Sequence, residues 1–463
     1  MIEGRLSEVE RAVRGRLIGN DAGFRGAGTD TRTLSPGALF FALKGERYDA
    51  HDMLDAALAA GAAGLVVSRD VATDAPRVLV DDTRAALGDL ARAWRSRFDI
   101  PVLAITGSNG KTTTKEMLAS ILRTQGPTLA TAGNLNNDIG VPLTLFQLGA
   151  EHRHAVIEMG ANRPNDIADL VAIALPTVAL VTMCGPAHLE GFGDIAGVAT
   201  AKGKIYTRLP ADGVAVINAD DAYAAQWRAT AGDVRILTFG LGPEADVSAR
   251  DIEHDAIGAG SRFTLRVGAA ERLVRLPFDG LHNVRNALAA AAAAHAIGVP
   301  LEAIVNGLET ASRVKGRLNL KRSRGGMRLI DDSYNANPAS VAAAIELLSR
   351  QPSARWLVFG DMGELGGGAA EAHRQVGLEA RAAGVDRLFA IGAEARAAAD
   401  AFGDGATWYA DVDAALPDLL ALDGADATLL IKASRFMQLD RIVDALLDPD
   451  APPAAAGERS TRC

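Results

Sequence analysis

Short apolar runs and segments of helical period alternate along the middle of the chain. From Ile100 an apolar run at 102–106 leads through a glycine-rich loop into a helical segment from Lys111 to about Thr124. The same rhythm continues, with strands expected at 154–158, 177–183 and 214–218 and helices at 165–174 and 195–209. Strands that alternate with helices predict a parallel sheet covered on both faces.

Residues 245–278 follow a different pattern, because polar and apolar residues alternate there. This period of two predicts antiparallel strands at the edge of the same sheet. The alanine-rich segment 283–296 then predicts a buried helix that completes the region, and its longest apolar tract, Ala287–Ala294, is too short to span a membrane.

Two further α/β regions flank this central one. Residues 1–98 predict a small mixed α/β domain with strands at 38–43 and 64–67 and a helix at 52–60. After Arg317 strands and helices alternate again, which predicts a separate, open, Rossmann-like α/β domain. Its expected strands are 328–330, 356–359, 387–391 and 428–431, and its expected helices are 339–349, 371–383 and 439–447.

Length and composition fit this division. A chain of 463 residues is long enough for about three domains, and we expect them at 1–98, 99–312 and 313–448, before a disordered tail at 449–463. The net charge of −9 predicts no general attraction to nucleic acid or anionic membranes. Two cysteines form neither a disulfide framework nor a zinc site, and no signal peptide is seen, so we expect a cytoplasmic protein without membrane insertion.

The loop after the first central strand has the context of a phosphate-binding loop. Glycines let backbone amides approach phosphate oxygens, and the following helix adds its dipole. Lys111 would reach the β- and γ-phosphates, and the Thr112 hydroxyl would bind Mg²⁺. Ile105 stands where the motif usually has its first glycine, and a tight turn with a capping threonine is the alternative. The candidate nucleotide-binding residues are Gly107, Ser108, Asn109, Gly110, Lys111, Thr112 and Thr113.

Two candidate metal ligands follow strands of the same region. Ligands of α/β sheets bind at the carboxyl ends of strands, and Glu158 ends the expected strand 154–158. Its carboxylate suits Mg²⁺ beside phosphates. His188 follows the expected strand 177–183 but is a less usual Mg²⁺ ligand. The alternatives are that Glu158 caps the next helix and that His188 bonds a loop carbonyl.

Lysine is scarce, with eight residues against 40 arginines, and one lysine stands in an unusual place. In the expected helix 195–209 an apolar stripe is formed by Ile195, Val198, Ile205 and Leu209, and Lys202 falls on that stripe. Such a lysine snorkels, pairs with a carboxylate or has a lowered pKa. A neutral amine there could react with CO₂ to give a carbamate able to hold a metal, although snorkelling or pairing is the commoner outcome.

Taken together, these motifs resemble the Mur ligase family along nearly the whole chain. The phosphate loop is the family's variant, which accounts for the missing first glycine, and Glu158 matches a Mg²⁺ ligand. The resemblance implies that His188 binds a second Mg²⁺ and that Lys202 is carbamylated; Lys204 replaces the glutamate usual in that segment. Segment 131–142 resembles the one that holds the muramoyl-peptide, with Asn134, Asn136 and Asn137 as binding candidates.

The resemblance continues on both sides. Asn283 resembles an adenine contact, Arg317 an arginine that reaches the ATP phosphates, and Asp332 a ribose contact, with Tyr334 and Asn335 near the nucleotide. A signature at 360–366 with His373-Arg374, and Lys432-Ala433-Ser434-Arg435, also resemble family segments. In the first domain the uridine-nucleotide region is matched by Asp30, Thr31, Arg32 and Lys44.

The resemblance implies an ATP-dependent amide ligase of peptidoglycan synthesis, and hence of cell shape and division. It would join D-alanyl-D-alanine to UDP-N-acetylmuramoyl-tripeptide through an acyl phosphate, as a monomer using ATP and two Mg²⁺ ions, with Lys111, Lys202, His188, Glu158 and Arg317 as catalytic candidates. Tripeptides with diaminopimelate or with lysine both remain compatible. The alternatives are another ligase of the superfamily, such as an earlier muramoyl-peptide ligase or a folylpolyglutamate synthase, and a nucleotide switch that hydrolyses ATP only to change shape.

Overall fold

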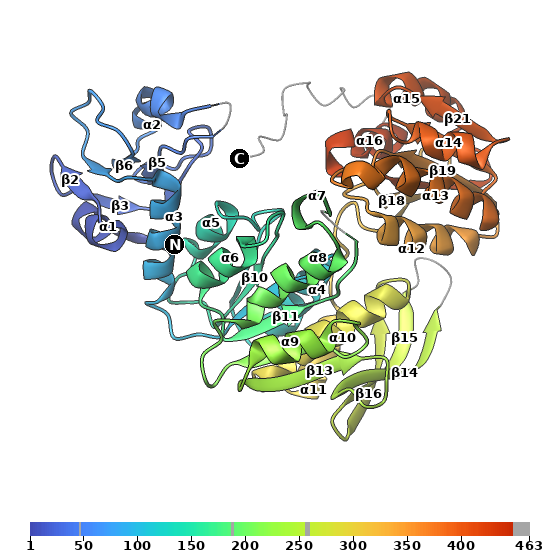
Figure 1. Ribbon diagram of the computed structural model, residues 1–463, viewed down its shortest axis with the longest axis horizontal. Helices are drawn as coiled ribbons and strands as arrows, with labels where there is room; N and C mark the ends of the chain where they lie inside the picture. Colours follow the sequence, from blue (N-terminus) through green and yellow to red (C-terminus); the bar gives the residue numbers. More distant parts are fainter. Residues whose placement is uncertain (46–47, 187–188, 255–259, 448–463) are drawn as a thin grey trace.

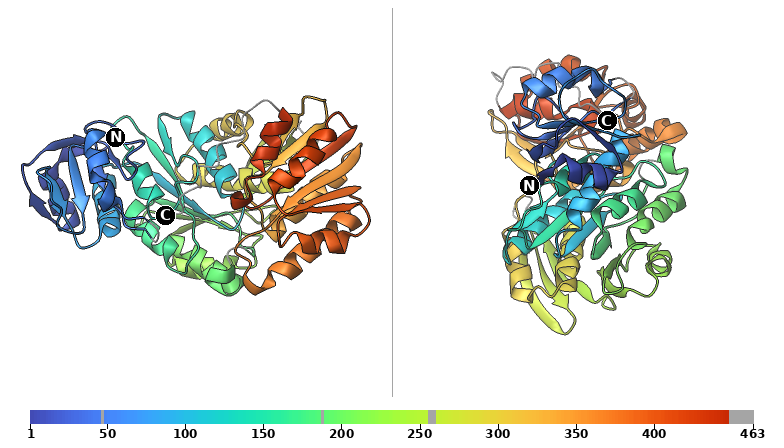
Figure 2. Two further views of the ribbon diagram at one scale, coloured as in Figure 1. Left: turned by 90° about the horizontal axis from the view of Figure 1, so that it is seen from above. Right: turned by 90° about the vertical axis from the view of Figure 1, so that its left-hand side faces the viewer.

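The chain folds into three α/β parts arranged in an open V. The computed structural model describes residues 1–45, 48–186, 189–254 and 260–447, so the tail expected to be disordered at 449–463 lies outside the described residues. The central part forms the base, and the N-terminal and C-terminal parts stand on its two ends (Figure 1). The left view of Figure 2 shows the same order along the long axis.

The N-terminal part contains two sheets and is fastened to the central part through the start of the chain. The Met1 ammonium donates to the Leu148 carbonyl at 2.9 Å, and the Trp94 indole donates to the same oxygen at 3.3 Å. One sheet pairs β1 (Glu3–Arg5) with β3 (Gly23–Arg25), and the other runs β2 (Arg16–Ile18), β7 (Arg77–Leu79), β6 (Gly64–Val67), β5 (Leu39–Phe41) and β4 (Ala27–Gly28). The helical segments are α1 (Leu6–Val13), η1 (Ala50–Met53), α2 (Leu54–Ala59) and α3 (Thr83–Arg95).

The central part is built on one large sheet, parallel as predicted, with antiparallel strands at one edge. In sheet order its strands are β16 (Ala270–Leu276), β15 (Ser261–Val267), β14 (Val247–His254), β13 (Arg235–Gly240), β12 (Val214–Asn218), β11 (Val178–Val181), β8 (Val102–Thr106), β10 (His154–Glu158) and β9 (Thr128–Ala130). Strands β14 to β16 form the antiparallel edge that the alternating pattern predicts. Because β8 lies inside the sheet between β11 and β10, the loop after it is flanked by the ends of both neighbours.

Helices cover both faces of this sheet. Buried apolar residues of α4 (Lys111–Arg123) and α10 (Leu281–Ala296) pack on one face, and α6 (Asp166–Ala174), α8 (Ile195–Gly203) and α9 (Ala224–Ala231) pack on the other. The remaining helical segments are α5 (Gly140–Leu145), α7 (Leu189–Phe192), η2 (Lys204–Tyr206) and α11 (Leu301–Glu309). The alanine-rich helix is thus buried, and no helix in the described part of the chain is long and apolar enough to cross a membrane.

One predicted helix is shorter than expected. The helix from Ile195 ends at Gly203 and continues as the 3-10 turn η2, so Leu209 lies beyond it. A Cβ at Gly203 would lie 2.9 Å from the Trp227 ring, and this close approach of α9 explains a glycine at the helix end. Ile195 is 39% exposed, whereas Val198 and Ile205 are fully buried, so the predicted apolar stripe is wrong at its first position.

The C-terminal part is the predicted open α/β domain with elements that the apolar pattern missed. Its sheet runs β17 (Asn319–Arg322), β18 (Arg328–Asp332), β22 (Ala427–Lys432), β19 (Ala354–Gly360), β20 (Arg387–Ile391) and β21 (Ala406–Tyr409). Its helical segments are α12 (Pro338–Ser349), η3 (Gly366–Gly368), α13 (Ala369–Ala382), α14 (Arg396–Phe402), α15 (Val412–Ala421), η4 (Arg435–Met437) and α16 (Asp440–Leu447). Strands β17 and β21 are edge strands with little buried apolar surface, which is why the sequence pattern did not reveal them.

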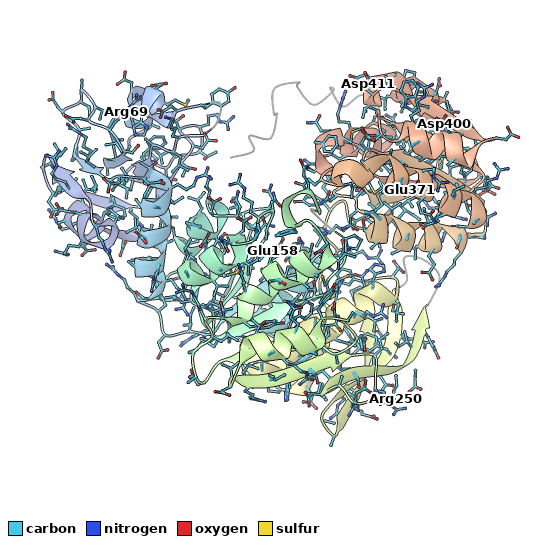
Figure 3. All side chains as sticks on the ribbon, viewed as in Figure 1. Arg69, Glu158, Arg250, Glu371, Asp400 and Asp411 are labelled. Atoms are coloured by element: carbon cyan, nitrogen blue, oxygen red, sulfur yellow. The ribbon has the colours of Figure 1, made fainter. Side chains whose placement is uncertain are left out.

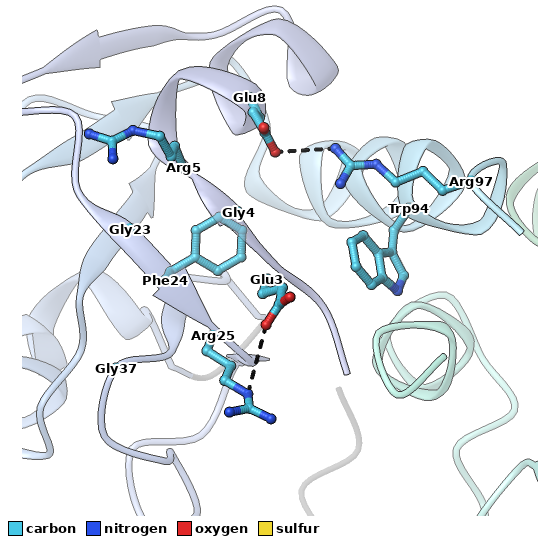
Figure 4. A pocket seen from close by; sticks show the side chains of 10 residues that line it. All are labelled: Glu3, Gly4, Arg5, Glu8, Gly23, Phe24, Arg25, Gly37, Trp94 and Arg97. Atoms are coloured by element: carbon cyan, nitrogen blue, oxygen red, sulfur yellow. Dashed lines mark hydrogen bonds and ion pairs between the residues drawn. The ribbon is translucent and has the colours of Figure 1, made fainter. Parts of the chain in front are cut away.

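A hollow of about 700 Å³ lies on the N-terminal part between β1, α1, β3 and α3 (Figure 4). Phe24 and Trp94 line it, and four of its charged side chains form two pairs: Arg97 lies 3.2 Å from Glu8, and Arg25 lies 3.9 Å from Glu3. None of its lining residues belongs to the glycine-rich loop after β8. This hollow is therefore not where the sequence predicts the chemistry.

Candidate active site

The glycine-rich loop joins the end of β8 to the start of α4 and has backbone geometry that only glycine accepts easily. Gly107 has φ 149° and Gly110 has φ 80°. An added Cβ at Gly107 would lie 1.8 Å from the Thr182 hydroxyl oxygen, and one at Gly110 would lie 2.2 Å from the Asn286 side-chain oxygen. Both glycines are thus required by conformation and by packing, which leaves the loop backbone tightly curved at the N-terminus of α4.

The end of β11 holds this loop in place. Ser108 donates its backbone N–H to the Met183 carbonyl at 2.9 Å, and its hydroxyl donates to the Gly185 carbonyl at 2.9 Å. The Thr182 hydroxyl donates to the Asn109 carbonyl at 2.6 Å. The sequence singled out Ser108 and Asn109 but missed Thr182, because a lone threonine at a strand end carries no motif signal.

Lys111 turns back over the loop that it follows. Its ammonium donates to the Gly107 carbonyl at 2.7 Å. Burial lowers the pKa of Lys111, Glu158 raises it in part, and Arg317 lowers it further. Two cations and one carboxylate therefore share one electrostatic environment at the loop.

Glu158 is buried at the end of β10 with one carboxylate oxygen unsatisfied. Its Oε1 accepts from the Asn136 side-chain amide at 2.8 Å, and its backbone N–H donates to the Thr131 hydroxyl at 2.9 Å. Its Oε2 is buried and has no hydrogen-bond partner among the residues that the structure describes. The capping alternative is wrong, because α6 begins only at Asp166 and its N-cap residue is Asn165. A buried, unpaired carboxylate oxygen beside a phosphate loop fits the donor that a hard divalent cation requires.

Lys202 is buried at the C-terminal end of α8. Its side chain is 1% exposed, so the snorkelling alternative is wrong. Within the described ranges its ammonium makes no hydrogen bond or ion pair, so no carboxylate of the described residues neutralises it. Burial lowers the pKa of Lys202 from 10.5 to about 7, and the neighbouring Lys111 ammonium lowers it further than the nearby Cys184 raises it. Much of this amine is therefore neutral, and nucleophilic, near neutral pH.

Lys204, which replaces the usual glutamate, has an evident local role. Its ammonium donates to the Pro164 carbonyl at 3.0 Å and to the Asn165 side-chain oxygen at 2.7 Å. It thereby joins the end of α8 to the start of α6 and points away from the buried Lys202 environment.

Arg317 brings the C-terminal part to the loop. Its guanidinium donates to the Thr112 hydroxyl at 3.0 Å and lies 4.6 Å from the centre of the Tyr334 ring. Its Nε is buried without a partner. The sequence predicted Arg317 and Thr112 separately, 205 residues apart, and the structure joins them directly.

The residues expected around ribose and adenine lie on both sides of this junction. The Lys432 ammonium donates to the Asp332 carboxylate at 2.5 Å and to the Asn335 carbonyl at 2.9 Å. Burial raises the pKa of Asp332, and the Lys432 and Arg317 cations oppose that rise. Asn283 on α10 donates to the Asp279 carbonyl and accepts from Asn286, whose oxygen borders Gly110.

The remaining predicted residues divide into two groups. Asn134, Asn136 and Asn137 lie between β9 and α5, where Asn136 contacts Glu158 directly and the Asn137 side chain accepts from Gly140 at the start of α5. Asp30, Thr31, Arg32 and Lys44 lie in the N-terminal part, where Asp30 and Arg32 form a 2.6 Å ion pair. His188 lies outside the described residues.

The described side chains do not by themselves surround a cation. Among residues 1–45, 48–186, 189–254 and 260–447 no group of three or more His, Cys, Asp and Glu side chains converges on a metal position. The arrangement instead concentrates Lys111, Lys202 and Arg317 with Glu158 and the Thr112 hydroxyl. In Figure 3 Glu158 lies in the central part, between the two flanking parts. Such a site suits a reaction between anions.

Comparison with known proteins decides the family. Family models for the Mur ligase middle domain, the Mur ligase glutamate ligase domain and the Mur ligase family catalytic domain match residues 105–294, 316–435 and 24–95. UDP-N-acetylmuramoyl-tripeptide–D-alanyl-D-alanine ligase of Escherichia coli is 44% identical over 96% of this chain and 99% of its own length. The chain belongs to the Mur ligase family.

Solved structures show the same architecture as this Mur ligase. A crystal structure of MurF from Acinetobacter baumannii superimposes with a TM-score of 0.91 at 38% identity, over 96% of this chain and 99% of that one. MurF from Thermotoga maritima in complex with ADP has a TM-score of 0.79 at 28% identity, over 91% and 97% of the two chains. The predicted fold class is thereby confirmed: a small mixed α/β N-terminal domain, a central domain built on a parallel sheet, and an open, Rossmann-like C-terminal α/β domain.

In this Mur ligase the buried ion pair between Lys432 and Asp332 supports a stability prediction. Lys432→Met should destabilise the protein by about 3 kcal/mol, because it leaves a buried carboxylate without its cation. The midpoint of the urea unfolding transition, followed by circular dichroism, measures the change. Arg374→Ala, which breaks the exposed pair with Glu371, is the matched control and should leave the midpoint almost unchanged. An equal shift in both variants would contradict the assignment.

Proposed function

We propose that this Mur ligase uses ATP to join D-alanyl-D-alanine to UDP-N-acetylmuramoyl-tripeptide, giving the pentapeptide precursor of peptidoglycan. The relative from Escherichia coli and one from Bacillus subtilis, 34% identical over 97% of this chain, carry the name of that activity. The observation that carries the proposal is the meeting of Arg317 with Thr112, since it brings a cation of the C-terminal part onto the phosphate loop.

The proposed reaction has two steps. The carboxylate of the tripeptide attacks the γ-phosphorus of ATP, so that a carboxyl O–P bond forms and the bond to ADP breaks. The amine of D-alanyl-D-alanine then attacks the acyl carbon, forming the amide and releasing phosphate and a proton. Both reactants of the first step are anions, so the cations Lys111 and Arg317 lower its barrier by holding negative charges together.

Magnesium would add to this positive charge by neutralising phosphate oxygens. The residues that fit it are the Thr112 hydroxyl and Glu158, whose buried Oε2 has no other partner. We propose that His188 and a carbamylated Lys202 hold a second ion. The neutral Lys202 nitrogen would attack the carbon of CO₂ and lose a proton, which turns a buried cation into an anionic oxygen donor.

The three parts would divide the work. We propose that residues 1–98 bind the UDP end of the substrate through Asp30, Thr31, Arg32 and Lys44, and that residues 99–312 hold ATP and the reacting groups. Asn134, Asn136 and Asn137 would bind the muramoyl-peptide, since Asn136 lies against Glu158. Residues 313–448 would contact the nucleotide through Arg317, Asp332, Tyr334 and Asn335, opposite Asn283.

Phosphate release in incomplete reaction mixtures tests the function. We expect release from ATP and Mg²⁺ only when UDP-N-acetylmuramoyl-tripeptide and D-alanyl-D-alanine are both present, because the acyl phosphate is consumed only by the amine. A coupled phosphate assay measures the rate, and mass spectrometry of the product identifies the pentapeptide. Steady release without either peptide substrate would favour the nucleotide-switch alternative. Release with an amino acid in place of the dipeptide would favour another ligase of the superfamily.

A further inference from the structure

A pair of asparagine side chains connects the phosphate loop to the C-terminal part. The Asn337 amide donates to the Asn109 side-chain oxygen at 2.8 Å, and the Asn109 amide donates back to the Asn337 oxygen at 3.3 Å. The two residues are 228 positions apart: Asn109 lies in the loop after β8 of the central sheet, and Asn337 lies in the loop after β18 of the C-terminal sheet. A reciprocal amide pair fixes both the distance and the relative orientation of the two groups that carry it.

Both members of the pair are anchored on rigid structure. The Asn109 carbonyl accepts from the Thr182 hydroxyl at 2.6 Å, which ties the residue to the end of β11. Asn337 is the N-cap residue of α12: its side-chain oxygen accepts from the Ser340 N–H at 2.9 Å, and its own N–H donates to the Ser340 hydroxyl at 3.0 Å. Movement of α12 relative to the loop therefore strains the pair rather than being absorbed by a flexible side chain.

The pair lies beside a second contact between the same two parts. Arg317 reaches Thr112, three residues after Asn109, and stacks on Tyr334, three residues before Asn337. One contact would allow the C-terminal part to pivot about it, whereas two contacts at neighbouring points restrict that rotation. The pair can affect nucleotide binding without touching the reacting atoms, because it helps to fix the positions of Arg317 and Tyr334.

We propose that Asn337 is a positioning residue that aligns the C-terminal part on the nucleotide through its amide pair with Asn109. This inference rests on the proposed use of ATP at the phosphate loop. It assigns to Asn337 a role beyond helix capping, because the cap needs only an oxygen acceptor for Ser340, whereas the pair also uses the amide of Asn337.

The test separates capping from pairing by the choice of side chain. Asn337→Ser keeps an oxygen that caps α12 but is too short to reach Asn109. Asn337→Asp also keeps the cap, but it replaces the amide that donates to Asn109 by an acceptor oxygen. Calorimetric titration with ADP should show affinity falling by about threefold to tenfold in Asn337→Ser, the loss expected for one net hydrogen bond or two weak ones. Asn337→Asp should lose at least as much as Asn337→Ser, because its carboxylate oxygen faces the Asn109 oxygen without a proton between them.

A double variant gives the decisive measurement. In an Asn109→Ala background the further change Asn337→Ser should alter ADP affinity by less than about twofold, because its partner is already gone. A full additional loss in the double variant would show that Asn337 acts independently of Asn109 and would overturn the proposal. The proposal would also be overturned if Asn337→Ser bound ADP as tightly as the parent, or more tightly, while its thermal unfolding transition matched that of the parent. If Asn337→Ser fails to fold, the comparison of Asn337→Asp in the two backgrounds decides.

Measurements of ADP binding and phosphate release on the parent protein distinguish failure of this proposal from failure of the proposed function. If the parent binds ADP but releases no phosphate with both peptide substrates, the proposed function fails and the coupling between Asn109 and Asn337 still decides the inference. If the parent binds no ADP, both fail.

Discussion

Replacing Lys202 by alanine is expected to reduce ligase turnover by about 10³-fold or more, the scale of losing a group that stabilises charge in a transition state. The side chain is fully enclosed, has no partner among the described residues, and has a pKa lowered to about 7 by burial. Such an amine is retained for its reactivity rather than for packing, since a buried, unpaired cation costs stability. Steady-state phosphate release with all substrates measures the loss.

Two further results would identify the carbamate as the reason. Small carboxylates such as acetate or formate should restore part of the activity of Lys202→Ala, because they can occupy the space of the lost carbamate. Removing CO₂ from the buffer should lower parent activity, and bicarbonate should restore it. Lys204→Ala is the matched control, since Lys204 lies two residues along and its ammonium hydrogen-bonds to Pro164 and Asn165 at the start of α6. Full activity of Lys202→Ala would contradict the carbamate proposal.

Stability should change in the opposite direction to activity. In CO₂-free buffer the folded chain releases the Lys202 proton near pH 7, whereas the unfolded chain holds it to about 10.5. Lys202 therefore lowers the free energy of unfolding by its full amount below pH 7, and this destabilisation disappears as the pH rises towards 10.5. Lys202→Met should have a higher Tm than the parent at pH 6, and the difference should shrink at pH 9. A lower Tm at pH 6 would indicate that packing dominates at this position.

Replacing Glu158 by glutamine is expected to lower kcat by about 10²-fold and to raise the Mg²⁺ concentration for half-maximal activity. Glutamine keeps the shape and an oxygen that accepts from Asn136, but it removes the anionic charge from the position of the unpaired Oε2. Rates measured across a Mg²⁺ titration at saturating ATP separate the two effects.

Two controls accompany the Glu158 prediction. Asn136→Ala leaves the carboxylate charge intact and removes the bond that orients it, so the Mg²⁺ concentration for half-maximal activity should rise less than in Glu158→Gln. Glu371→Gln changes an exposed glutamate on α13 and should behave as the parent. An unchanged Mg²⁺ requirement in Glu158→Gln would contradict its assignment as a metal-binding residue.

The sequence was most informative where function and local structure coincide. The phosphate loop could be placed because strand, glycines, lysine and helix are contiguous, and the structure adds that Gly107 and Gly110 are also held by Thr182 and Asn286. Lys202 was found because the pattern placed a lysine among buried residues, although the helix ends earlier than its period suggested. The sequence pattern did not predict the edge strands β17 and β21, because they bury too little apolar surface to produce a recognisable apolar run.

The sequence by itself determined the α/β class, the order of the three parts, and the position of the glycine-rich loop between a strand and a helix, because each depends on residues close together in the chain. Only the tertiary structure decided that Arg317 meets Thr112, that Asn337 pairs with Asn109, and that Lys202 has no described partner. Those facts depend on how separately folded parts dock. Docking is set by shape and hydrogen bonding between residues up to 228 positions apart, which no local pattern records.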